Sequence, residues 1–138
     1  MYYAQKGKGS FLNGEQIFVS GAETMGESLI SVGTSPYFKG EADEIFETFA
    51  KVYKDCQDIR RCGSAALDMA HAACGRIEAY FEKHLKIWDY AAGTLIVREA
   101  GGEVLDYNGD PLVMEPIGNV VAGNKHIPKI LTEKYLKS

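Results

Sequence analysis

The sequence predicts a layered α/β fold preceded by a short β-meander. From residue 28 onward, apolar strand-like runs alternate with helical periods, a pattern typical of a sheet covered by helices. Within residues 76–82, apolar side chains alternate with side chains that carry a polar group. Asn13-Gly14 is a strong signal for a two-residue hairpin. We therefore expect a meander over residues 1–20 and an α/β domain over residues 21–138.

Short runs of apolar and aromatic residues predict the strands of the first third of the chain. Strands are expected at residues 1–5, 10–12 and 16–20, and an apolar strand at 28–33. The next segment, residues 41–55, has the period of an amphipathic helix. Its predicted apolar face consists of Ile45, Phe46, Phe49, Val52 and Tyr53.

The second half repeats the alternation. A strand is expected at residues 58–62, then a helix at 63–74 whose small apolar side chains suit close contact with a sheet. A strand with one buried face follows, with Ile77, Ala79 and Phe81 opposite Glu78, Tyr80 and Glu82. The remaining elements are a helix at about 89–100, strands at 103–105 and 119–122, and a helix at 126–136.

Composition narrows the classes of function. The formal net charge is -4, and no basic patch is available to neutralise nucleic-acid phosphates, so we expect no nucleic acid as a main partner. A small phosphate ester remains compatible, because a bound divalent cation would supply positive charge. No apolar run approaches the ~20 residues that span a bilayer. Three cysteines without a CxxC motif and the lack of a signal-like N-terminus favour a cytoplasmic protein with reduced thiols.

Three places in the sequence carry candidate chemistry. Asp89 lies at a strand-to-helix junction, where it would serve either as an N-cap or as an oxygen ligand for Mg²⁺. Glu82 ends a strand and would be either solvated or an acceptor for polyol hydroxyls. The turn Gly63-Ser64-Ala65 opens a helix, with Ser64 as an N-cap or as part of a ligand contact.

Four segments, in order, carry a family resemblance. Ile87-Trp88-Asp89 through Gly102 resembles the C-terminal signature of the inositol monophosphatase family, the Mg²⁺-dependent, lithium-sensitive sugar phosphatases. The other three segments are similar to further motifs of that family. They are Ala4 to Ile17, Arg61 to Met69, and Val120 to Asn124.

The resemblance implies roles for these residues. Asp89 corresponds to a metal-ligating Asp, Glu82 to the Glu that holds substrate hydroxyls, and Gly63, Ser64 and Ala65 to the substrate-lining turn. It also implies a small phosphorylated polyol or sugar as substrate. Relatives with this signature act on inositol phosphates, fructose 1,6-bisphosphate or phosphonucleotides. The family's other signature, Asp-Pro-x-Asp-Gly-Thr, does not occur in these 138 residues.

The resemblance therefore favours the C-terminal half of a phosphatase, inactive by itself. The alternatives are a non-catalytic module that binds a ligand or protein with this half-fold, and an independent enzyme with a one-carboxylate metal site. In the parent fold, residues 1–20 would belong to the sheet of the N-terminal half. We expect these strands instead to mediate a homo-oligomer, because an unpaired strand edge is a template for another chain. The alternative is that they fold back onto the chain's own sheet and leave a monomer.

Overall fold

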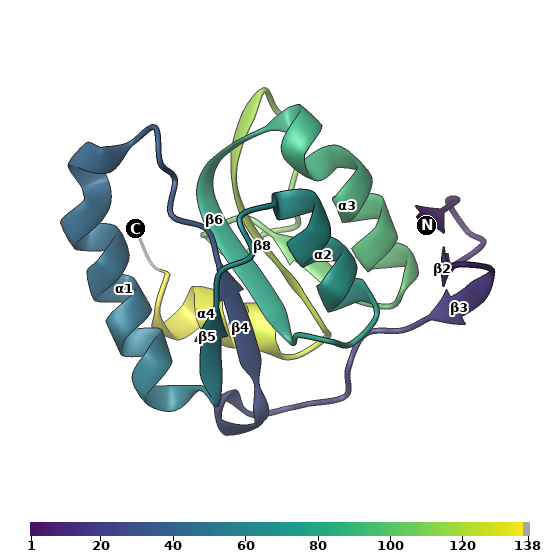
Figure 1. Cartoon of the computed structure of the whole chain (residues 1–138), viewed down its shortest axis with the longest axis horizontal. Helices are drawn as coiled ribbons and strands as arrows, with labels where there is room; N and C mark the ends of the chain where they lie inside the picture. The colour runs from purple at the N-terminus through teal and green to yellow at the C-terminus, as the bar shows by residue number, and fades with distance from the viewer. Residues whose placement is uncertain (137–138) are drawn as a thin grey trace.

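The computed structural model describes residues 1–136 and contains two sheets and four α-helices within them (Figure 1). No helix of this part of the chain is long and apolar enough to cross a membrane. In chain order the elements are β1 (Tyr2–Ala4), β2 (Ser10–Leu12), β3 (Glu15–Ile17), β4 (Leu29–Val32), α1 (Ala42–Asp55), β5 (Asp58–Arg60), α2 (Ala65–Ala73), β6 (Ala79–Lys86), α3 (Ile87–Glu99), β7 (Glu103–Leu105), β8 (Ile117–Gly123) and α4 (Ile127–Lys134).

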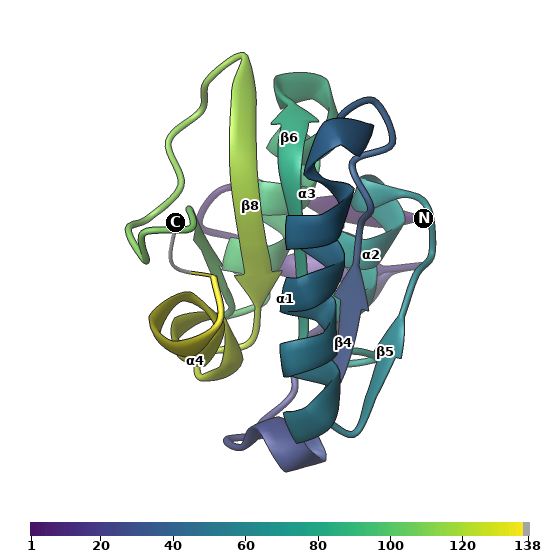
Figure 2. The same ribbon diagram turned by 90° about the vertical axis from the view of Figure 1, so that its left-hand side faces the viewer.

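The larger sheet has the strand order β5-β4-β6-β8-β7, with β4 parallel to β5 and β6, and β8 antiparallel to β6 and β7. Helices α1 and α4 cover one face and α2 and α3 cover the other (Figure 2). Each face has its own apolar core, one around Phe81 and Val121 and the other around Tyr80 and Val120. The predicted layered α/β/α arrangement is confirmed.

The central strand β6 differs from its prediction. Residues 76–82 were expected to have one buried face, but the strand spans Ala79–Lys86 and both of its faces are covered. Tyr80 is fully buried against α2 and α3, and Glu78 is buried as well, with its carboxylate accepting the Leu29 N–H at 2.8 Å. The alternation correctly separates the two faces of the strand. The face that carries Tyr80 is covered by α2 and α3, however, and is not exposed to water.

Two helices also differ in detail from their predictions. Helix α1 occupies nearly the expected range, but Phe46 and Tyr53 are 56% and 58% exposed, so its buried stripe is narrower than predicted. Helix α3 begins at Ile87, two residues before the expected start. Trp88, in the first turn of this helix, is 74% exposed.

The N-terminal residues form a separate antiparallel sheet, β1-β2-β3, that lies beside α3 (Figure 1). The N–H groups of Gly7 and Gly9 donate to the two carboxylate oxygens of Glu99 at 3.0 and 2.9 Å. These donors hold the pKa of Glu99 below its usual range. Val19 N–H also donates to the carbonyl of Ala100 at 3.1 Å, so the meander is attached to the end of α3 and takes no place in the larger sheet.

Candidate functional site

The candidate residues gather at one edge of the larger sheet. Strands β4, β5 and β6 are parallel, so their carboxyl ends meet at the same edge, and α2 and α3 both begin there (Figure 1). The last paired residue of β4, Val32, lies opposite Phe81, so Glu82 is the first residue of β6 beyond the end of β4. The carboxyl edge of parallel strands is the usual place for a ligand in α/β proteins.

The turn before α2 has the predicted form. Gly63 has a φ of 84°, a left-handed conformation that suits glycine. Ser64 is the N-cap of α2, and its Oγ accepts the Leu67 N–H at 3.2 Å. This confirms the capping role, which leaves the first N–H groups of the helix available for an anion or a hydroxyl.

Glu82 is not the solvated strand end that one interpretation predicted. It is half-buried inside β6, and both of its carboxylate oxygens have protein donors. The Tyr80 hydroxyl donates to Oε1 at 2.5 Å, and the Ser35 N–H donates to Oε2 at 3.0 Å. The carboxylate therefore has a fixed orientation before any ligand binds.

Sequence reasoning missed a second carboxyl group close to this site. Asp68, in α2, is only 2% exposed and accepts a hydrogen bond from Ser31 Oγ at 2.6 Å. Burial raises the pKa of Asp68 to about 6, and the negative charge of Glu82 acts in the same direction, against the hydrogen bond from Ser31 and the charge of Arg61. One signal was available, since Asp68 is the single acidic residue in a helix expected to be buried almost all round.

Asp89 lies in the first turn of α3, but it is not the N-cap. Lys86 has that position, and Asp89 is three residues further on, where its Oδ2 accepts the Lys86 N–H at 3.1 Å. A carboxylate at this position stabilises the helix start. The N-cap interpretation is therefore corrected to an N3 capping contact, which uses one carboxylate oxygen.

The donor set does not fit a Mg²⁺ ion held by this chain alone. Residues 1–136 contain no group of three or more His, Cys, Asp or Glu side chains arranged to hold a metal ion. Mg²⁺ requires several oxygen ligands in near-octahedral geometry. Asp89 can supply one carboxylate to such a set, and the remaining ligands would have to come from outside these residues.

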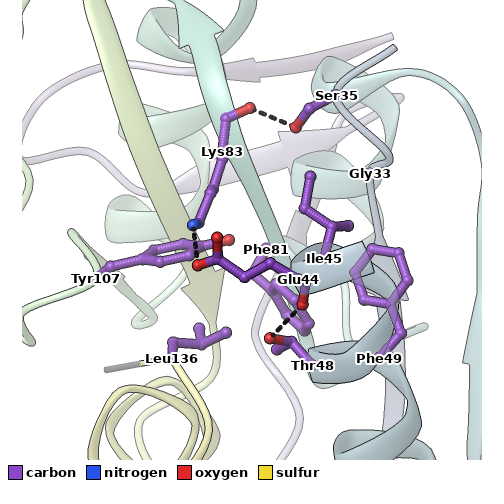
Figure 3. Close-up of a pocket in the computed structure, with 10 residues that line it drawn as sticks. All are labelled: Gly33, Ser35, Glu44, Ile45, Thr48, Phe49, Phe81, Lys83, Tyr107 and Leu136. Carbon is purple, nitrogen blue, oxygen red and sulfur yellow. Dashed lines mark hydrogen bonds and ion pairs between the residues drawn. The ribbon is translucent and has the colours of Figure 1, made fainter. Parts of the chain in front are cut away.

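A small cavity lies on the opposite face of the sheet, next to the same edge. Ser35, Lys83 and α1 enclose a cavity of about 20 Å³ that is lined in part by Phe49, Phe81 and Tyr107 (Figure 3). Lys83 Nζ lies across it, 3.2 Å from Glu44 Oε1. This volume holds about one water molecule, whereas small-molecule sites are typically of several hundred Å³. A sugar-sized ligand therefore does not fit this cavity.

His84 lies beside this sheet edge and is partly buried. It lies in an irregular part of β6, with a φ of 62°, and its Nε2 is 2.7 Å from Glu41 Oε2. Its ring stacks on Phe38 with the centroids 3.9 Å apart. The segment between β4 and α1 is thereby attached to β6 next to Glu82.

The fold is a layered α/β/α half-domain with a carboxylate-bearing sheet edge, and comparison with known proteins gives its family. The model of the inositol monophosphatase family matches residues 1–138, and the chain belongs to that family. It is 40% identical over 131 residues to Nus factor SuhB of Escherichia coli strain K12, covering 95% of this chain and 49% of the relative. It is 38% identical over 133 residues to the inositol-1-monophosphatase of Rhizobium meliloti, covering 96% and 50%.

Solved structures agree with these matches. The extragenic suppressor protein suhB from Bartonella henselae superposes with a TM-score of 0.89 at 36% identity, over 99% of this chain and 52% of that chain. SaIMPase-II bound to inositol monophosphate superposes with a TM-score of 0.86 at 27% identity, over 98% and 52%. The chain thus spans about half the length of the relatives that it matches.

Proposed function

We propose that this chain is the C-terminal portion of a Mg²⁺-dependent phosphomonoesterase that acts on inositol phosphate or a related sugar phosphate, and that it is inactive by itself. The observation that carries the proposal is the orientation of Glu82, whose oxygens are fixed by Tyr80 and Ser35 at the sheet edge where α2 and α3 begin. Membership of the inositol monophosphatase family supports the same reaction class.

Each candidate residue has a role in this proposal. The carboxylate of Glu82 accepts substrate hydroxyls, and the turn Gly63-Ser64-Ala65 lines the substrate with the N–H groups that open α2. Asp89 would supply one oxygen to the metal, while its Oδ2 accepts the Lys86 N–H. The bound Mg²⁺ would supply activation of water and neutralisation of the leaving oxygen.

A non-catalytic binding module is the second candidate. The observation that favours it is the single carboxylate of Asp89, since the described residues contain no complete metal-binding group. The chain is also similar to proteins named Nus factor SuhB, at 38–40% identity. In this case the half-fold would bind a ligand at Glu82, or a protein partner, without turnover.

We also propose a cytoplasmic location and self-association. The three cysteines are free, as expected for a reducing compartment. The outer edges of β1 and β3 have no partner strand among the described residues, which leaves them available to a second chain.

A chimera tests the proposed function. The N-terminal half of the Rhizobium meliloti relative, joined to this chain, should hydrolyse inositol 1-phosphate with Mg²⁺, while the chain alone should not. Asp89→Asn and Glu82→Gln should each lower the activity strongly, and Asp43→Asn, at an exposed position in α1, should not. A folded chimera without activity would favour the non-catalytic module.

A further inference from the structure

Several residues that have no assigned role so far contact the Glu82 carboxylate and fix its position. We infer that Gly33, Ser35 and Tyr80 are positioning residues that form a cradle for the Glu82 carboxylate and prepare it to receive a vicinal diol. This inference rests on the proposed function, since it assumes that Glu82 meets polyol hydroxyls, and it extends that function to residues that touch no substrate themselves.

The first part of the cradle is the Tyr80 hydroxyl. Tyr80 is fully buried, and its hydroxyl donates to Glu82 Oε1 at 2.5 Å. Burial and the charge of Glu82 raise the pKa of Tyr80, so the hydroxyl keeps its proton and remains a donor at neutral pH. A short hydrogen bond between a neutral hydroxyl and a carboxylate is among the stronger contacts available to that carboxylate.

The second part is a strained turn. Ser35 has a φ of 51°, a left-handed conformation that is unfavourable for a residue with a side chain. The turn is held from both sides, since Ser35 Oγ donates to the Lys83 carbonyl at 2.8 Å and the Gly33 N–H donates to the Phe81 carbonyl at 3.1 Å. The result of this conformation is that the Ser35 N–H is directed at Glu82 Oε2. Strained backbone that is fixed by its surroundings is typical of functional sites.

The third part is the space above Gly33. A Cβ atom at this position would lie 1.9 Å from the Glu82 Cδ and 1.9 Å from its Oε1. No residue with a side chain can occupy this position while Glu82 keeps its place. The Glu82 carboxylate therefore lies directly on the backbone of Gly33. The cradle requires glycine at this position, because any side chain would displace the carboxylate.

The cradle leaves a defined acceptor capacity. A carboxylate offers about four lone-pair positions, and the protein uses one on each oxygen. Each oxygen can accept one more hydrogen bond, so two neighbouring hydroxyls of one ligand can bind Glu82 together. A polyol with adjacent hydroxyls fits this arrangement better than a ligand with one hydroxyl.

The test uses this chain labelled with ¹⁵N and myo-inositol as the probe. In the wild-type chain, myo-inositol should shift the amide signals of Ser35 and Glu82. Tyr80→Phe keeps the ring and removes the donor, and it should weaken the apparent affinity about tenfold. Tyr135→Phe is the matched control, because the Tyr135 hydroxyl donates to a different carboxylate, Asp55 Oδ2, at 2.5 Å, and its loss should leave the affinity unchanged.

Two further variants separate positioning from folding. Ser35→Ala removes the contact with the Lys83 carbonyl and should weaken binding, and a second variant, Ser35→Gly, tolerates the left-handed backbone and should recover part of the loss. Urea unfolding of each variant shows whether the fold is intact. Unchanged affinity in folded Tyr80→Phe, or no shift in the wild-type chain at saturating probe, would overturn the inference.

The outcomes also separate this inference from the proposed function. An inactive but folded chimera, together with myo-inositol shifts that Tyr80→Phe removes, would reject the phosphatase and keep the cradle. An active chimera whose Michaelis constant is unchanged by Tyr80→Phe would keep the phosphatase and reject the cradle.

Discussion

Replacing Asp68 with asparagine should remove a pH-dependent loss of stability from this fold. The Asp68 carboxyl is 2% exposed, and its pKa is raised from 3.8 to about 6, mainly by burial. Between these pH values the folded chain holds a proton that the unfolded chain has released. Stability therefore falls as the pH rises from about 4 to about 6, and it stays lowered above that range.

The magnitude follows from the shift. A difference of about two pKa units, at ~1.4 kcal/mol per unit, corresponds to roughly 3 kcal/mol of stability lost when the pH rises above 6. In Asp68→Asn the new amide oxygen would still accept the Ser31 hydrogen bond, but the side chain would carry no ionisable group. Its two amide protons need partners in a buried place, which costs about 1–3 kcal/mol at every pH, so the change with pH is the quantity to compare.

The assay is urea unfolding of the wild-type chain and of Asp68→Asn at a series of pH values from about 4 to about 8. The difference in free energy of unfolding between the two should shift by up to about 3 kcal/mol in favour of Asp68→Asn between about pH 4 and about pH 6. Asp110→Asn, at an exposed position, is the control and should follow the wild type. A difference that is constant over this range would refute the reasoning.

Three further outcomes are expected. Gly93→Ala should cost about 1–3 kcal/mol in urea unfolding, because its Cβ would lie 2.8 Å from Met69 Sδ in α2, whereas Gly26→Ala has nothing within 4 Å and should cost less. Ser64→Ala should cost about 1 kcal/mol through loss of the α2 N-cap, and an unchanged midpoint would contradict this. Light scattering should show an oligomer, and a monomer of 15.2 kDa that is unaffected by deletion of residues 2–19 would rule out the association.

Local patterns were sufficient for most elements. The Asn13-Gly14 turn, the existence of helix α1 and the Gly63-Ser64 start of α2 depend on neighbouring residues, and the structure confirms these three features. Asp89 was placed in the first turn of a helix for the same reason, although its capping position was wrong by three residues.

Long-range packing accounts for the errors. Whether Tyr80 and Glu82 face water or a second helical layer depends on α2 and α3, which the alternation of one strand does not encode. Trp88 has a large aromatic side chain of the kind that protein cores often contain, yet it is exposed on α3. The contact between Glu82 and Ser35 joins residues 47 positions apart, so neither spacing nor propensity could predict the cradle.

Magnesium titration calorimetry most directly tests whether this chain supplies one ligand of a metal site that a second half completes. The chain alone should show no saturable heat, because Asp89 is one carboxylate and Mg²⁺ needs several oxygen ligands. The chimera should bind Mg²⁺, and Asp89→Asn in the chimera should weaken that binding. Saturable binding by the chain alone, or a chimera whose affinity is unchanged by Asp89→Asn, would contradict the account.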